Sequence, residues 1–239
     1  MGSLEIKTIF TLTLFGKEIP ITETVIVSWG VMIILIITSL ALTRRLKTIP
    51  TGAQAILETG IEFLNNFAKK QFGPFAKYLG PYIGSLFLFI LTSNVIGFIT
   101  PLEIKAFGHE FVPPFPIRPP TRDINVTGAF AVVSVFLVLI CGIAAKGGRG
   151  WLKSFLHPAP IMLPFHILDY FTRTMSLALR LFGNILGGFV MMGLIEKLLP
   201  IGIPAVAGIY FDFFDGMLQA IIFVFLTSLY LSEAVIVNE

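Results

Sequence analysis

Arg180 is the residue of this chain whose chemistry most needs an explanation. It lies inside an apolar stretch that runs from about Ile161 to Leu199, and no acidic residue adjoins it in the sequence. A guanidinium group stays protonated in proteins, and placing one at the centre of a bilayer costs roughly 3 kcal/mol or more. Arg180 must therefore face protein or water, and it must have a partner or a function.

Other polar residues share a helix face with Arg180. Residues three or four positions apart lie on the same side of an α-helix. This spacing predicts a polar stripe between faces covered by leucine and phenylalanine side chains. Its members are Arg173, Ser176, Arg180, Asn184 and Gly187. The stripe fits either a structural ion pair with a carboxylate inside a helical bundle or a functional site, since charges inside membranes are usually functional.

The composition places the chain in a membrane. Hydrophobic residues make up 55% of the 239 residues, charged residues make up 13%, and the mean hydropathy is +0.88. A soluble domain usually carries about 25% charged residues. The net charge of +3 is small, so no nucleic-acid partner is expected. The single cysteine, Cys141, excludes an intrachain disulfide and a cysteine-based metal site.

The hydropathy pattern predicts an all-α polytopic membrane protein with about five membrane-embedded helices. Each run expected to cross a core of about 30 Å holds about 20 or more apolar residues. Residues 1–21 form an external segment, and residues 22–239 form a single membrane domain. The expected spans are 22–43, 78–100 and 126–145, followed by two longer helices over 161–199 and 204–237. The last two exceed the length of a perpendicular span, so we expect them to be strongly tilted.

Three further segments differ from the spans. In residues 51–72, helical spacing puts apolar residues on one face and polar residues on the other. This pattern predicts an amphipathic helix along the membrane interface. Residues 102–123 contain five prolines, which favours an extended external loop. The glycine-rich loop 146–150 lacks the Gly-Lys-Ser/Thr ending of a phosphate-binding loop, so no nucleotide is expected on this chain. Asn94, inside the second span, is expected to form an interhelical hydrogen bond.

The basic residues predict an orientation. Arg44, Arg45 and Lys47 follow the first span directly. The positive-inside rule assigns that end to the cytoplasm, or to the matrix or stroma of an organelle, and places the N-terminus outside. Residues 1–20 carry neither a signal-peptide pattern nor a transit-peptide pattern. The bacterial plasma membrane is the expected location, with the thylakoid membrane as the alternative.

Several motifs of this chain resemble those of the a subunit of F-type ATP synthases. The main motif runs from Ser176 to Asn184, SLALRLFGN, and a second, QAIIF, starts at Gln219. Two others, PTGAQ from Pro50 and LFLFILTSNVIG from Leu86, occur in the family's order. The resemblance implies a stator subunit without catalysis or cofactor. It also implies contacts with the c-subunit ring, the b-subunit peripheral stalk, the rest of the synthase and the lipid bilayer.

The resemblance also suggests how the last two helices pair. With Gln219 placed opposite Arg180 in an antiparallel hairpin, polar residues gather on both sides of Arg180. An outer cluster then comprises Asp212, Asp215 and Glu196, and Asn184 meets Asp215. An inner cluster comprises Asp169, Arg173, Tyr230 and Glu233. In this register Arg173 faces Leu226 and Thr227, Asp169 approaches Tyr230, and the glycines at 187 and 188 meet Asp212. We expect the ion, H⁺ or Na⁺, to enter through the outer cluster and to leave through the inner cluster.

The chain departs from the family pattern at two positions. Many bacterial members have a glutamate where this chain has Phe189 and a histidine where it has Asp212. We therefore expect Asp212 to supply the outer acidic group. Two alternatives remain: a stand-alone ion channel or secondary transporter, and a membrane scaffold in which Arg180 merely pairs with Asp215. No metal-ligand cluster or nucleophile-base pair is visible.

Overall fold

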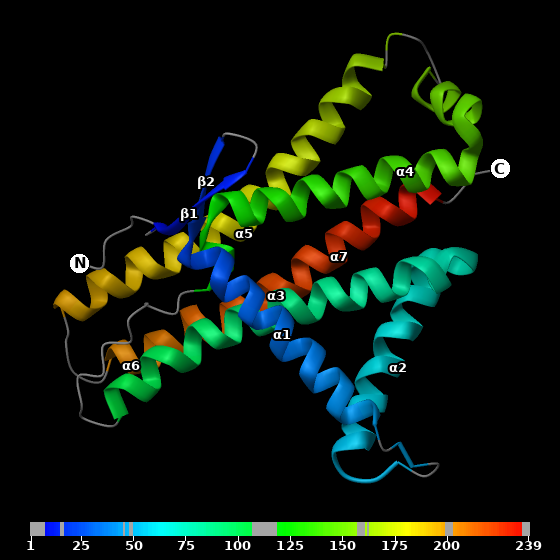
Figure 1. Cartoon of the computed structure of the whole chain (residues 1–239). Coiled ribbons are helices and arrows are strands. Elements are labelled where there is room, and N and C mark those ends of the chain that lie inside the picture. Colours follow the sequence, from blue (N-terminus) through cyan, green and yellow to red (C-terminus); the bar gives the residue numbers. More distant parts are fainter. Residues whose placement is uncertain are drawn as a thin grey trace. The chain divides into compact units, whose positions relative to one another are not determined.

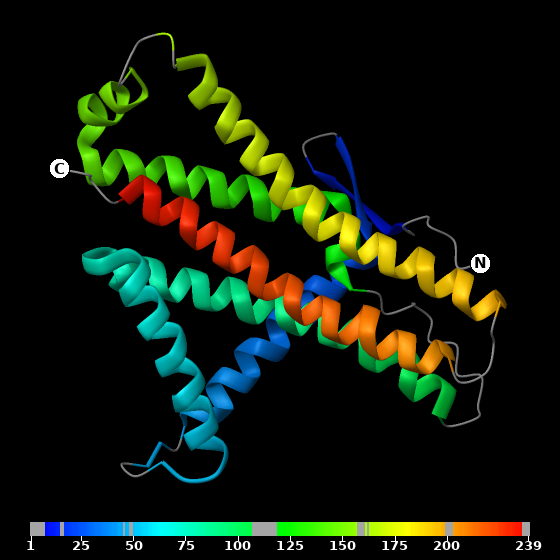
Figure 2. The ribbon, with the colours of Figure 1, turned by 180° about the vertical axis from the view of Figure 1, so that it is seen from behind.

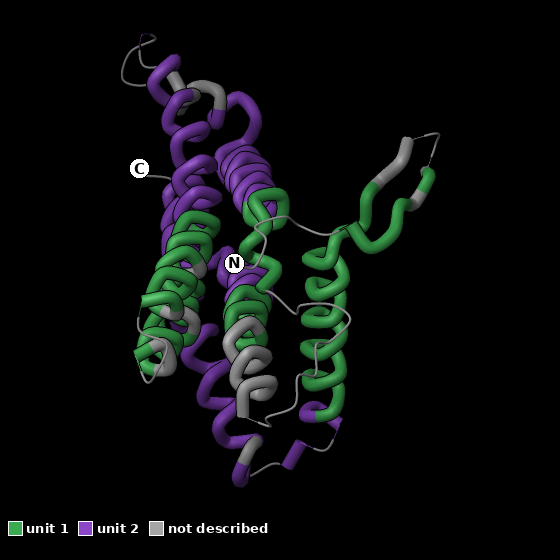
Figure 3. The backbone as a smooth tube through the Cα atoms, turned by 90° about the vertical axis from the view of Figure 1, so that its left-hand side faces the viewer, with its two compact units in different colours: residues 1–41, 88–127, 181–220 green, residues 42–87, 128–180, 221–239 purple. Residues whose placement is uncertain are grey.

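A computed structural model of the whole chain defines the fold (Figure 1). It describes every residue except 1–7, 15–16, 45, 48–49, 107–118, 157–160, 162, 199–202 and 236–239. The chain forms two compact units, coloured in Figure 3. Unit 1 contains residues 1–41, 88–127 and 181–220, and unit 2 contains residues 42–87, 128–180 and 221–239. Long helices run from one unit into the other.

The fold is predominantly helical, as the hydropathy pattern predicts. Within the described residues, five helical stretches are long and apolar enough to cross a membrane. They are Glu23–Thr43, Gln54–Ile96, Ile124–Trp151, Leu163–Ile195 and Val206–Val235. Many of their large apolar side chains are exposed in the isolated chain, including Ile37 at 60% and Phe136 at 60%. These surfaces suit lipid or partner subunits, and an all-α polytopic membrane protein is confirmed.

An N-terminal hairpin is the one β-structure in the described part of the chain, and the hydropathy pattern does not predict it. Strand β1 (Thr8–Leu14) pairs antiparallel with β2 (Lys17–Thr22). From Phe10 to Leu14, threonines alternate with apolar residues, which is the period of a strand. The chain then enters α1 (Glu23–Thr43).

The turn from α1 to α2 (Ala53–Phe72) is fixed by Gln54. Its Oε1 accepts a hydrogen bond from the Lys47 backbone N–H at 3.0 Å, and its Nε2 donates to the Lys47 carbonyl at 2.8 Å. Helix α2 has polar and apolar faces, and Ile56 and Phe63 on it are 77% and 71% exposed. In its last turn Phe72 is buried, and Ser232 near the end of α7 donates a hydrogen bond to the Gln71 carbonyl at 2.7 Å within unit 2.

Helix α3 (Ala76–Ala106) follows the short 3₁₀ turn η1 (Gly73–Phe75) and continues past Pro101, where the sequence predicts its end. The expected external loop over 102–123 is therefore wrong for its first residues. A proline removes only its own N–H donor, and transmembrane helices tolerate that loss. The remaining prolines lie in 107–118, outside the described residues, or near the 3₁₀ turn η2 (Pro120–Arg122).

Helix α4 (Ile124–Leu156) begins at a buried cap and contains a sharp kink. Asp123 is 2% exposed; its Oδ1 accepts the Asn125 backbone N–H at 2.9 Å, and its Oδ2 accepts a hydrogen bond from Thr24 Oγ1 at 2.8 Å. Gly147 has φ 70° and ψ 154°, and helical structure resumes after it. The expected loop over 146–150 is thus a one-residue kink. The returning segment brings Trp151 within 3.1 Å of the position that a Cβ on Gly142 would occupy.

The last two long segments are α5 (Leu163–Leu198) and the run α6 (Ile203–Gly208), η4 (Ile209–Phe214) and α7 (Asp215–Val235). Figures 1 and 2 show them from opposite sides. Element η4 is a π-helix, so the second segment is not one regular α-helix. In unit 1, Gly188 of α5 lies against Phe211 of η4. In unit 2, Arg173 of α5 contacts Glu233 of α7. Both contacts follow the expected antiparallel order.

Candidate functional site

Arg180 lies at the middle of α5 and is exposed. The neighbouring packing face is made by Leu177 and Leu181, which are 1% and 0% exposed. Arg180 therefore points away from the helix face that is buried. Among the described residues of its unit, Arg180 has no hydrogen bond or ion pair. Along the predicted stripe, Ser176 is also exposed and Asn184 is half-buried.

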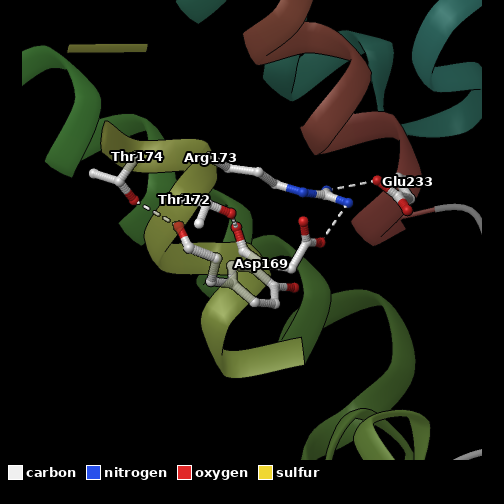
Figure 4. A network of polar contacts seen from close by, with 6 residues as sticks. Asp169, Thr172, Arg173, Thr174 and Glu233 are labelled. Atoms are coloured by element: carbon white, nitrogen blue, oxygen red, sulfur yellow. Dashed lines mark hydrogen bonds and ion pairs between the residues drawn. The ribbon is translucent and has the colours of Figure 1, made fainter. Parts of the chain in front are cut away.

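A second arginine on the same helix has a complete set of partners. Arg173 donates through Nη1 to Glu233 Oε2 at 2.6 Å, and its Nη2 lies 2.7 Å from Asp169 Oδ2 (Figure 4). Its Cζ atom lies 4.7 Å from the centroid of the Tyr230 ring. The four expected inner residues thus form one group, which we call the Arg173 cluster: Asp169, Arg173, Tyr230 and Glu233. With two carboxylates and one guanidinium, the cluster carries a formal charge of about −1.

The register of the Arg173 cluster differs from the expected one. Arg173 contacts Tyr230 and Glu233, so the expectation that it faces Leu226 and Thr227 is wrong by about one helical turn. Side chains on a helix lean toward its N-terminus. The long arginine side chain therefore reaches the level of Asp169, one turn back, where the sequence already places Tyr230. In unit 1, Gly188 lies against Phe211, one residue from the expected Asp212.

Gln219 is an interior residue of unit 1, although two nearby residues, Leu218 and Ile222, are 38% and 36% exposed. Its own side chain is 2% exposed. Its Nε2 atom is buried and has no hydrogen-bond partner within the described part of the structure. An unpaired buried amide donor costs roughly 1–3 kcal/mol. An unpaired group of this kind calls for an explanation, such as a bound water molecule or ion, or a functional role.

The geometry thus combines a cation on an exposed helix face, unpaired among the described residues of its unit, with a separate acidic cluster. Comparison with known protein families identifies the group to which such a chain belongs. A family model described as ATP synthase A chain matches residues 25–232. The chain belongs to this family. The sodium-ion-specific ATP synthase subunit a of Propionigenium modestum is 34% identical over 219 residues, covering 90% of this chain and 75% of that protein.

Membership of the ATP synthase A chain family establishes the general function. The chain is an ion-translocating subunit of the membrane sector of an F-type ATP synthase, and it associates with the rest of that complex. The five membrane-length helices agree with a multi-pass membrane protein. Arg180 and Gln219 both lie inside the matched region.

The acids expected on the outer side lie at or near the ends of the last two long segments. Asp212 lies in the π-helix η4, and Asp215 is the first residue of α7 and half-buried. Glu196 lies in the last turn of α5. The side chains of Asp212 and Glu196 lie outside the described residues. No group of three or more potential metal ligands occurs in the part of the chain that the structure describes.

One buried polar network of this chain is only partly predictable from the sequence. Asn94 Nδ2 donates to the Gly216 carbonyl at 2.8 Å, and Thr121 Oγ1 donates to Asn94 Oδ1 at 2.8 Å. The expected interhelical hydrogen bond of Asn94 is therefore confirmed. Its acceptor is a backbone carbonyl on α7. Because every residue has such a carbonyl, the sequence does not indicate which one is bonded. Gly216, which permits the close approach, is the one signal that points to it.

Proposed function

We propose that Arg180 separates two half-paths for H⁺ or Na⁺ and couples ion flow to rotation of a c-subunit ring. The observation that carries this proposal is an exposed arginine at the centre of a helix long enough to span a membrane, with no ion pair in the part of its unit that the structure describes. A guanidinium at that depth needs a partner, and the described residues of its own unit supply none. A carboxylate that visits Arg180 from another subunit would satisfy it.

The proposed cycle follows from this single fixed charge. An ion reaches a ring carboxylate through the outer acids Asp212, Asp215 and Glu196, together with Asn184. Rotation carries the neutralised carboxylate through lipid, and the ion leaves past the Arg173 cluster. Arg180 then stabilises the emptied, ionised carboxylate as it passes. Because its positive charge repels a cation, ions cannot pass directly between the half-paths without rotation.

Coulomb's law indicates that the attraction has a suitable size. Opposite unit charges about 4 Å apart attract by roughly 4 kcal/mol at an effective dielectric constant of about 20. Desolvation of both groups offsets part of this energy. The remainder favours release of the ion without trapping the ring. Lysine would serve less well, because burial lowers its pKa readily, whereas arginine stays charged.

The other assignments complete the proposal. The chain itself carries out no catalysis; it binds the c-ring and the b-subunit peripheral stalk, and it lies in a bacterial plasma membrane. A thylakoid membrane is the alternative location. The basic residues after α1 favour an external N-terminus, and the amphipathic helix α2 favours a position along the inner interface. The name of the Propionigenium modestum relative makes Na⁺ the first ion to test.

ATP-driven pumping by the whole synthase in reconstituted vesicles tests this function. The wild-type complex should transport ions, and the Arg180→Ala complex should assemble but transport none. Sodium-free buffer distinguishes the two ions, because only a sodium-coupled enzyme stops pumping there. Pumping by the Arg180→Ala complex near the wild-type rate would refute the role of Arg180.

A further inference from the structure

The π-helix η4 is followed directly by a tightly held point of α7. The backbone N–H of Asp215 donates to the carbonyl of Tyr210, five residues earlier, which closes the π turn. A π turn holds one more residue than an α turn, and such turns occur often at functional sites. The turn contains Asp212 and ends at Asp215. A contact that holds the residue after Asp215 therefore also restricts the positions of these two acids and of the next turn of α7.

Asn94 of α3 holds that point through its side-chain amide. It donates to the carbonyl of Gly216, the residue after Asp215, at 2.8 Å. The oxygen of the same amide accepts a hydrogen bond from Thr121, also at 2.8 Å. Asn94 is 5% exposed and Thr121 is 0% exposed, so water does not compete for these bonds. Both ends of the amide are used, and its orientation is fixed.

Two glycines bring the surrounding backbones close to η4 and α7. A Cβ on Gly216 would lie 3.0 Å from Asn94 Cβ, which is too short for a normal contact between carbon atoms. On α5, the Cβ position of Gly188 lies 3.6 Å from Phe211 Cβ, an ordinary contact. The start of α7 is thus held by α3 through Asn94, and η4 is held by α5 through Gly188. All of these residues belong to unit 1.

Gln219 lies on the same side of α7 as Gly216, because residues three positions apart share a helix face. It is buried, and its Nε2 has no partner in the described part of the chain. If no contact fixed the rotation of α7, the helix could turn until this amide was exposed to water or formed a hydrogen bond. We propose that Asn94 is a positioning residue, whose hydrogen bond to the Gly216 carbonyl fixes the rotation of α7 and so holds Gln219 in place on the ion path. This inference rests on the proposed function and on a role of Gln219 in the ion path, which the resemblance to the a subunit suggests; we call this role the proposed function of Gln219.

The test compares Asn94→Leu, Gln219→Leu and the double variant in the intact synthase. Ion pumping is measured per assembled complex, so a loss of assembly does not count. We expect Asn94→Leu to lower pumping about tenfold, the effect of losing one buried hydrogen bond of ordinary strength. Since Asn94 acts through Gln219, the double variant should pump no more slowly than Gln219→Leu alone. The inference would be overturned if the losses of the two single variants multiplied in the double variant, or if Asn94→Leu left pumping unchanged.

A cross-link separates this inference from the role of Gln219 itself. Cysteines are introduced by Gly188→Cys and Phe211→Cys, and the native cysteine is removed by Cys141→Ala. The Cβ positions of residues 188 and 211 lie about as far apart as the two Cβ atoms of a disulfide. Oxidation should give a high yield of the disulfide, and adding Asn94→Leu should lower that yield at least about twofold. An unchanged yield would overturn the positioning role. Wild-type pumping in Gln219→Leu combined with a lowered yield would instead refute the proposed function of Gln219. Gly30→Ala, in open space, is the control and should change neither readout.

Discussion

Arg173 and Arg180 lie about two helical turns apart on α5, and only Arg173 is ion-paired among the described residues of their unit. Arg173 lies between Asp169 and Glu233, with the Tyr230 ring beside it. Arg180 is exposed next to the buried Leu177 and Leu181. The two identical side chains therefore have different surroundings: Arg173 joins two helices of its unit, whereas Arg180 is exposed and is unpaired among the described residues of that unit.

Replacing Arg173 with glutamine should have a moderate effect. The partners Asp169 and Glu233 are 48% and 62% exposed, and ion pairs this exposed contribute roughly 0.2–1 kcal/mol each. We expect a small loss of thermal stability in the purified synthase and slower ion release, with coupling preserved. Glu233→Gln, which removes one of the two ion pairs, should cause no larger loss. Complete loss of pumping in Arg173→Gln would show that Arg173, too, is essential.

Asp212→Asn should slow ion transport but leave ATP hydrolysis coupled to it. The amide cannot take up or release a proton, and it binds Na⁺ more weakly than a carboxylate does. Asp215 follows three residues later. The loss should therefore be smaller than the roughly 100-fold effect of removing a sole proton-transfer group. Flux and hydrolysis, measured together in vesicles, should fall in parallel. Unchanged flux in Asp212→Asn would show that the outer path uses other residues. Asp215→Asn is the matched comparison.

Gly147→Ala should destabilise the kink in α4. At φ 70° and ψ 154°, Gly147 has a backbone conformation that is essentially restricted to glycine, and a side chain there costs roughly 1–3 kcal/mol. Thermal inactivation of the purified synthase measures this loss. Gly148→Ala is the matched control, because its Cβ would lie in open space and its φ is not positive. Equal stability of the two variants would contradict the account of the kink.

The sequence predicts the helices well because long apolar runs have few other stable conformations in a membrane. It also predicts that Arg180 needs a partner and that Asp169, Arg173, Tyr230 and Glu233 gather. It does not predict the N-terminal hairpin, since alternation in so short a segment is a weak signal. The kink at Gly147 and the π turn at Ile209–Phe214 depend on tertiary packing, which hydropathy does not record.

The register error at Arg173 has a related cause. Pairing residues by level treats each side chain as a point on the helix axis, whereas an arginine side chain spans more than one turn. The burial of Gln219 likewise depends on tertiary packing, which the local sequence pattern does not record. Local patterns therefore locate the polar residues, and tertiary contacts decide which of them face the interior.

Ion leak and ATP synthesis, measured on the same vesicles that contain the Arg180→Gln synthase, test the central claim most directly. Glutamine is polar but uncharged, so the variant should assemble normally. We predict no ATP synthesis and a passive ion flux above that of the wild-type complex, because no fixed charge separates the half-paths. Synthesis near the wild-type rate, with no added leak, would contradict the account.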